Sequence, residues 1–197
     1  MVARIRILGI DPGLAHVGYG IIERRDSGVE HVLHGVVNTP ARHPTAQRLL
    51  AIYRELSAVI DEHKPDEVAI EELFFGANVK TVISVSQARG VAILATAASE
   101  IPLAEYSPLQ IKLALVGYGR ASKRQVQMMV KALLRLEEVP RPDHAADALA
   151  AALCHLHALA PLRALREAAR QQASSAGEMS ENKILLGQQR SRRRRRR

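Results

Sequence analysis

The sequence has few of the features that mark secreted, disulfide-bonded or membrane-spanning proteins. Cys154 is the only cysteine and tryptophan is absent, so no disulfide can form within the chain, and the paired cysteines typical of small secreted domains are missing. No apolar run reaches the roughly 18 to 20 residues that span a bilayer. The first residues follow a strand pattern and not that of a signal peptide. We therefore expect no membrane segment and a cytoplasmic location.

Positive charge is concentrated at the end of the chain. The net charge of the 197 residues is +8, and residues 174–197 carry +6 of it, with eight lysines and arginines against two glutamates. Hydrophobic residues make up 47% of the chain, which is enough for one buried core. We predict a single domain over residues 1–173 and a disordered basic tail over 174–197. The basic balance favours a polyanionic partner, with nucleic acid as the leading candidate.

The hydrophobic pattern predicts an α/β fold. Three consecutive strand patterns come first, the second and third joined by a polar, glycine-containing turn, and helix and strand patterns then alternate. This order implies one five-stranded mixed sheet flanked by helices. The predicted strands are 4–11, 17–24, 29–38, 67–71 and 103–106, and the predicted helices are 45–63, 79–100, 108–116, 122–134 and 143–159.

Two of the predicted strands end on a carboxylate. Asp11 closes the first strand and Glu71 closes the fourth, whereas Glu72 would point to the opposite side. Open α/β sheets bind ligands beyond the carboxyl ends of their strands, so these two acids converge if their strands are neighbours. If these strands are adjacent, we expect the two acids to meet without a lysine or arginine placed between their carboxylates, and their repulsion then favours a bound cation. A simple turn role for Asp11 is the alternative.

The last predicted helix adds further candidate ligands in its first turns. His144 and Asp147 are three residues apart and can share one face, whereas Asp143 directly precedes an alanine-rich helix and is assigned to its N-cap. Hard oxygen ligands suit Mg²⁺ or Mn²⁺, and two such ions about 4 Å apart can hydrolyse a phosphodiester. The pattern therefore predicts a metal-dependent nuclease with Asp11, Glu71, His144 and Asp147 as catalytic metal ligands.

With these residues in view, the chain resembles the RuvC family of crossover junction endodeoxyribonucleases. Four motifs carry the resemblance, in matching order and spacing, and the match covers about residues 3–160 without the tail. The motifs are Gly9-Ile10-Asp11-Pro12-Gly13, Ala69-Ile70-Glu71, Ser86-Gln87-Ala88-Arg89-Gly90 and Ala145-Ala146-Asp147-Ala148-Leu149-Ala150.

The resemblance implies a ribonuclease-H-like fold, a homodimer and paired symmetric metal-dependent nicks that resolve four-way Holliday junctions in DNA recombination and repair. It also suggests a branch-migration motor of the RuvA and RuvB type as a partner. Asp11, Glu71 and Asp147 match family metal ligands, whereas His144 stands where the family often has aspartate. Because imidazole is a softer ligand than carboxylate, we expect Mn²⁺ to be favoured over Mg²⁺.

Candidate DNA contacts also follow from the resemblance. Phe74 matches a family residue thought to stack on unpaired bases, a contact that tolerates any sequence, and Lys112 and Lys123 match basic family positions near the site. A symmetric junction calls for a two-fold dimer. Helix 79–100 is the interface candidate, although its apolar residues fit an ordinary core equally well.

Alternative functions and sites are weighed against this interpretation. Asp11-Pro12-Gly13 also resembles the opening motif of actin-like and sugar-kinase phosphotransferases, but the chain is short for such a protein and lacks a later glycine-rich loop. A noncatalytic junction-binding protein is the second alternative. His155 and His157 flank Cys154 in a pattern that suggests zinc, but the apolar helix around them favours packing.

Overall fold

The computed structural model describes residues 4–72 and 79–159. The chain divides into a compact unit of residues 1–157 and a second unit of residues 158–197. Phe74, most of the second unit and the whole predicted tail lie outside the described residues, so the boundary at residue 173 stays a prediction. Within the described part, no helix is both long enough and apolar enough to cross a membrane.

The first unit contains the five-stranded mixed sheet that the sequence predicts, with strand order β3-β2-β1-β4-β5. The first three strands are antiparallel neighbours, and β4 and β5 join the other edge of β1 in parallel. This arrangement places the carboxyl ends of β1, β4 and β5 at one edge of the sheet. The strands are β1 (Ile5–Asp11), β2 (His16–Arg25), β3 (Gly28–Asn38), β4 (Glu67–Glu71) and β5 (Leu103–Tyr106).

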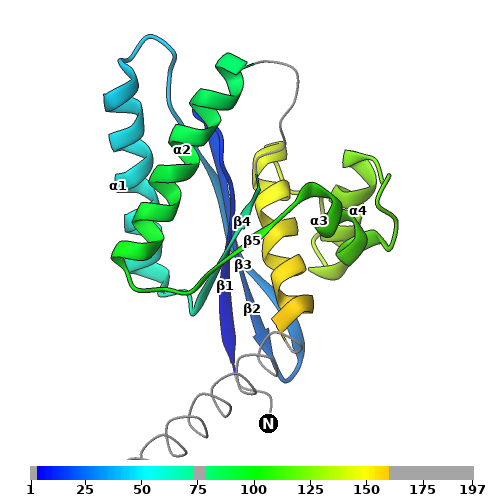
Figure 1. Ribbon diagram of the computed structural model, residues 1–197. Coiled ribbons are helices and arrows are strands. Elements are labelled where there is room, and N and C mark those ends of the chain that lie inside the picture. Colours follow the sequence, from blue (N-terminus) through cyan, green and yellow to red (C-terminus); the bar gives the residue numbers. More distant parts are fainter. Residues whose placement is uncertain (1–3, 73–78, 160–197) are drawn as a thin grey trace, which may run out of the picture. The chain divides into compact units, whose positions relative to one another are not determined.

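Helices cover both faces of the sheet (Figure 1). One face packs against α1 and α2, and the other lies under α3, α4 and a closing helix that begins at residue 143 and continues through residue 157. The α2 helix ends at Ala98 and not at the predicted Glu100, because Glu100 takes a left-handed backbone angle (φ 56°) that ends a helix. The labelled helices are α1 (Thr45–His63), α2 (Val79–Ala98), α3 (Pro108–Val116) and α4 (Lys123–Leu133).

The two faces of β1 and β4 have different roles. Side chains alternate along a strand, so Leu8, Ile10, Val68 and Ile70 point into the apolar core beneath α1 and α2. The intervening odd-numbered residues, Asp11 and Glu71 among them, point toward the closing helix. The apolar core is therefore built on one face and the acidic residues are presented on the other.

Glycines let the closing helix lie unusually close to the sheet. A Cβ atom built on Gly9 would lie 1.9 Å from the carbonyl oxygen of Ala148, and one built on Gly18 would lie 1.9 Å from that of His144. No side chain fits in such a space, since real Cβ contacts of this kind are essentially never below 3.0 Å. The helix backbone thus rests directly on β1 and β2, which fixes the height and register of its first turns.

The α4 helix is anchored at its start by a capping box. The Ser122 hydroxyl accepts a hydrogen bond from the Gln125 backbone N–H, and the Gln125 side chain in turn accepts from the Ser122 backbone, which completes a capping box. Because the helix begins at this fixed point, Lys123 is held in its first turn, beside the start of the closing helix.

Candidate metal centre

Sheet register brings two predicted ligands to one edge. Ile10 of β1 pairs with Ile70 of β4 in parallel, so Asp11 and Glu71 are the next residues on two adjacent strands. Both follow the alternation that directs them toward the closing helix. Glu72 is exposed, in agreement with the choice of Glu71 as the residue that faces the site.

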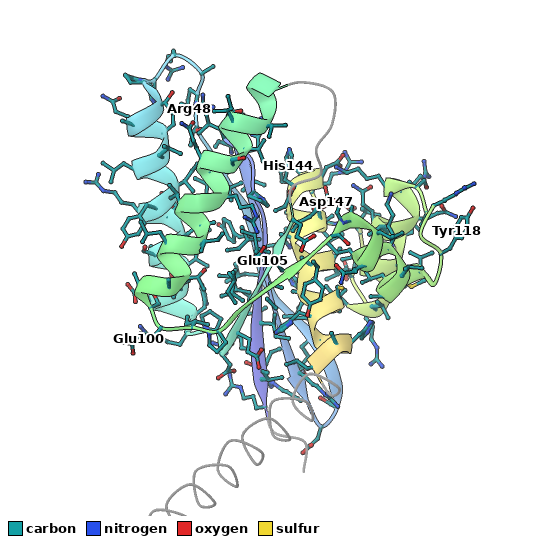
Figure 2. The ribbon with its side chains drawn as sticks, viewed as in Figure 1. Arg48, Glu100, Glu105, Tyr118, His144 and Asp147 are labelled. Carbon is teal, nitrogen blue, oxygen red and sulfur yellow. The ribbon has the colours of Figure 1, made fainter. Side chains whose placement is uncertain are left out.

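The closing helix supplies the rest of the cluster. Ligand atoms of Asp11, His144 and Asp147 all lie within 4.8 Å of one another. Figure 2 labels His144 and Asp147 near the start of the closing helix, in the segment that Gly18 allows to approach the sheet. Carboxylate and imidazole groups at this separation fit a divalent cation. The residues present therefore suit the metal that the acidic pattern predicts.

His144 is oriented by two neighbours. Its Nδ1 lies 2.7 Å from Asp11 Oδ2 in a hydrogen bond, and its ring stacks on the ring of His16 with centroids 5.5 Å apart. The bond to Asp11 is the main reason that the pKa of His144 lies above its ordinary value, and it outweighs partial burial. His16 is in turn held by Asn38, whose Oδ1 is 2.7 Å from the His16 Nδ1. Sequence reasoning missed His16 and Asn38.

Lys123 adds a positive charge to the acidic cluster, where it pairs with the two aspartates of the closing helix and not with Asp11 or Glu71. Lys123 Nζ lies 2.8 Å from Asp147 Oδ2 and 3.5 Å from Asp143 Oδ2. Burial opposes the charge of Lys123, but its bonds and attraction to these carboxylates prevail and raise its pKa. Lys123 reaches this cluster from the first turn of α4.

The capping role predicted for Asp143 is wrong. The closing helix already includes residue 143, so Asp143 lies in its first turn and not at the N-cap. Its carboxylate is exposed and faces Lys123. Lys123 therefore links α4 to Asp143 and Asp147, the two aspartates in the first turns of the closing helix.

The charged form of Glu71 is disfavoured by its surroundings. Burial, followed by repulsion from Asp11 and Asp147, raises its pKa to about 7. Burial also raises the pKa of Asp147, with a further contribution from Asp11, although Lys123 acts in the opposite direction. Carboxyl groups with raised pKa values in a shared cleft are typical of functional sites. A divalent cation would relieve this repulsion.

Two hollows flank the candidate metal ligands. One, of about 240 Å³, places Lys112 and Lys123 beside Glu71 and Asp147. The other, of about 590 Å³, lies on the His144 side and is lined by His16, Asn38, Arg141, Pro142, Asp143 and His144. The two predicted DNA-binding lysines thus share one hollow with two of the predicted ligands. Phe74, the third predicted DNA contact, lies outside the described residues.

The zinc alternative at Cys154 is not supported. His155 is fully buried and uses both ring nitrogens, with Nε2 2.8 Å from Glu67 Oε2 and Nδ1 2.7 Å from the Tyr106 hydroxyl. His157 Nδ1 instead lies 3.2 Å from the Ala114 carbonyl oxygen. Among the residues with described placement, Asp11, His144 and Asp147 form the group that could hold a metal. Burial with two hydrogen bonds therefore accounts for His155, whereas the exposed His157 contacts a backbone carbonyl oxygen.

Comparison with known proteins points to one family. The family described as "Crossover junction endodeoxyribonuclease RuvC" matches residues 7–155. A protein of that name from Syntrophomonas wolfei is 54% identical over 153 residues, which cover 78% of this chain and 89% of that protein.

Two solved structures agree with this match. Thermus thermophilus RuvC has 35% identity and a TM-score of 0.74, covering 79% of this chain and 95% of that one. T. thermophilus RuvC in complex with a Holliday junction substrate has 36% identity and the same TM-score of 0.74, covering 78% and 93%. The fold agrees with the ribonuclease-H-like prediction.

Proposed function

The chain belongs to the RuvC family of crossover junction endodeoxyribonucleases, and from this membership we propose that it resolves Holliday junctions by paired metal-dependent phosphodiester hydrolysis. The observation that carries the proposal is the approach of Asp11, His144 and Asp147 to within 4.8 Å, with Glu71 electrostatically coupled to Asp11 and Asp147. These residues come from two strands and one helix that are far apart in the sequence. The reaction would support DNA recombination and repair.

Each ligand has a distinct part in the proposed mechanism. Asp11 and Glu71, at the ends of β1 and β4, and His144 and Asp147, on the closing helix, would hold two divalent cations, which when bound activate water and stabilise the leaving oxygen. Because the helix backbone rests on Gly18, the imidazole and the carboxylates keep their separation when a substrate strand arrives. Preorganised ligands of this kind lower the cost of reaching the transition state.

Lys123 is proposed to exchange partners during the reaction cycle. In the described arrangement it neutralises Asp147 at 2.8 Å, and a cation bound by Asp147 would compete for the same oxygen. The released ammonium group, together with Lys112 in the same hollow, would then contact DNA phosphates. Phe74 is proposed to stack on unpaired bases at the junction centre.

The dimer and its partners are proposed from the same membership. The described part of α2 buries Ala88, Ala92 and Ala95 in the core but exposes Ile83 and Leu94 by 55% and 58%. The alanine side of the helix therefore packs in the core, and the side with Ile83 and Leu94 is free to form a two-fold interface. We propose that the homodimer acts in the cytoplasm and receives junctions from a branch-migration complex of the RuvA and RuvB type.

Metal preference provides a prediction specific to His144. An imidazole in place of a carboxylate should favour Mn²⁺ over Mg²⁺, so we expect faster cleavage with Mn²⁺. Because the neutral ring binds metal and Asp11 raises the pKa of His144, activity should fall as pH drops through this titration. The test compares Mn²⁺ and Mg²⁺ rates between pH 6 and 9 for the natural protein and His144→Asp. A metal ratio and acid limb that are the same in both proteins would contradict the prediction.

The central experiment uses a synthetic four-way junction. The protein is incubated with the junction or a linear duplex of equal length, with Mg²⁺ or Mn²⁺ and without ATP. We expect paired nicks at symmetric positions in the junction alone, and no nicks with Asp11→Asn, although this variant should still bind the junction. Binding without nicking by the natural protein would favour the noncatalytic alternative, and activity that requires ATP would favour the phosphotransferase.

A further inference from the structure

Apart from His144, the residues that line the larger of the two hollows have no part in the mechanism above. This hollow has a volume of about 590 Å³, against about 240 Å³ for the hollow that contains the two lysines. Its lining residues come from the β2 start, the β3 end and the segment that leads into the closing helix. A groove of this size beside the proposed nuclease centre can accommodate part of a nucleotide strand, whose sugars offer apolar surface and whose phosphates need a positive charge.

The metal ligands lie between the two hollows. Asp147 lines the smaller hollow and His144 lines the larger one, while Asp11 lies within reach of both residues. A DNA strand that presents its scissile phosphate to these ligands must continue on both sides of that phosphate. The smaller hollow offers Lys112 and Lys123 on one side, which leaves the larger hollow for the other.

Arg141 supplies a positive charge to the larger hollow. Its side chain is exposed, and within residues 4–72 and 79–157 it takes part in no hydrogen bond or ion pair. The nearest acid of the groove lining, Asp143, faces Lys123 at 3.5 Å. A guanidinium group can donate two parallel hydrogen bonds to a phosphate. Arg141 is therefore positioned and available for this contact.

The opposite wall of the groove is held in place before any ligand arrives. The His16 ring is fixed by Asn38 at 2.7 Å and stacks on His144. The Asn38 amide also donates to the Val36 carbonyl at 3.5 Å. This wall connects the groove directly to a metal ligand, so that a nucleotide seated between His16 and Arg141 would adjoin the scissile phosphate.

We propose that the groove formed by His16, Asn38 and Arg141 is a phosphate-binding subsite for the cleaved strand. It receives a backbone phosphate next to the scissile one, on the side away from Lys112 and Lys123. This inference rests on the proposed nuclease function. It assigns to Arg141 a direct contact with DNA and to His16 and Asn38 the wall against which the sugar and phosphate lie.

The first test measures junction binding without cleavage. Arg141→Gln is compared with the natural protein and with Arg54→Gln, which removes an exposed arginine from α1 on the opposite face of the sheet. Affinity is measured in EDTA by fluorescence anisotropy between about 50 and 300 mM salt. Loss of one phosphate contact should weaken binding several-fold and reduce the slope of log K against log salt by about 0.9. Arg54→Gln and the thermal stability of both variants should be unchanged.

The second test locates the phosphate. Junctions carry a single uncharged methylphosphonate one nucleotide to either side of the scissile phosphate. Each replacement can weaken binding by the natural protein, because phosphate contacts are proposed on both sides, but Arg141→Gln should be insensitive to one of the two replacements only, since both changes remove the same contact. An unchanged salt slope together with additive losses would overturn the subsite. Because both tests measure binding in EDTA, they are separate from failure of the nuclease proposal, which absence of junction nicking by the natural protein would show.

Discussion

Two histidines of the closing helix each pair with a carboxylate of a neighbouring strand at nearly the same distance, but the two pairs differ in their surroundings. His144 Nδ1 lies 2.7 Å from Asp11, and His155 Nε2 lies 2.8 Å from Glu67. The side chains of the first pair are 41% and 16% exposed, whereas those of the second are 0% and 8% exposed. The two histidines are eleven residues, or about three helical turns, apart. Sequence spacing alone therefore does not distinguish them.

The difference lies in what surrounds each pair. At His155, the second ring nitrogen contacts the Tyr106 hydroxyl at 2.7 Å, so the imidazole is satisfied on both sides and closed to solvent. At His144, further carboxylates converge, and two of them, Glu71 and Asp147, have raised pKa values. A satisfied pair stabilises the fold. An excess of acid at the solvent-accessible pair favours a metal ion instead.

Strand β4 repeats the contrast on one face. Glu67 and Glu71 are four residues apart and point in the same direction. His155 engages the first carboxylate, whereas burial and neighbouring acids raise the pKa of the second to about 7. The strand and the closing helix are thus joined by a hydrogen bond at one end and carry the proposed metal ligands at the other.

The largest expected effect comes from breaking the buried pair. His155→Ala leaves the Glu67 carboxylate without its imidazole partner and opens space in the core, which should lower the free energy of unfolding by about 3 to 5 kcal/mol. Junction cleavage by the folded fraction should change little at low temperature. Urea unfolding and single-turnover nicking measure the two effects. If His155→Ala does not fold, His155→Gln provides the second variant, and full stability in either would contradict the structural role.

Breaking the exposed pair should have the reverse outcome. His144→Ala removes a proposed metal ligand, and we expect about a 100-fold loss in cleavage rate, equivalent to about 2.7 kcal/mol in the barrier. A half-exposed pair adds only about 0 to 1 kcal/mol to stability, so the unfolding curve should barely move. Cleavage within a few-fold of the natural rate would exclude His144 from the metal centre.

The raised pKa of Glu71 should make the free energy of unfolding depend on pH. Its pKa is about 7 in the folded state and near its ordinary value after unfolding, so the folded protein binds the proton more tightly between about pH 4.5 and 7. The free energy of unfolding should therefore decrease as pH rises through this window, by on the order of 2 kcal/mol from Glu71 after allowance for its partial exposure. Urea titrations in EDTA should show this decrease reduced in Glu71→Gln. Parallel pH curves for the two proteins would contradict the raised pKa.

The smallest expected effect isolates one hydrogen bond of the buried pair. Tyr106→Phe keeps the ring but removes the hydroxyl that contacts His155, and the loss should be about 1 kcal/mol in the free energy of unfolding. Junction affinity and cleavage should not change. A loss of cleavage at full stability would mean that Tyr106 acts on the metal centre and not on the buried pair.

Much of the fold was predictable because local pattern and tertiary structure agree. The bounds of α1, β4 and β5 follow directly from hydrophobic periodicity and flanking prolines. The rule that ligands gather at the carboxyl ends of strands also predicts that Asp11 and Glu71 lie near each other, as the pairing of β1 with β4 shows. The spacing of three residues between His144 and Asp147 correctly places both side chains on one face of the closing helix.

The contacts that sequence reasoning missed depend on how elements pack. The approach of Lys123 to Asp147 is set by the position of α4 against the closing helix, and no spacing along the chain reports that distance. The stacking of His16 on His144 likewise depends on the close approach that Gly18 permits. Gly9 in β1 and Gly18 in β2 were a visible signal in the sequence of a helix lying close to the sheet. They do not reveal which histidines meet.

The glycine contacts beneath the closing helix have a consequence for how the protein can change. Gly9 and Gly18 set the height of that helix by backbone contact, whereas the apolar core under α1 and α2 lies on the other face of the sheet. Laboratory evolution for heat resistance could therefore replace many side chains in that core while cleavage continues. A single added methyl group at Gly18 would collide with the backbone of His144, one of the proposed metal ligands, so tolerance to substitution should differ sharply between the two faces of one sheet.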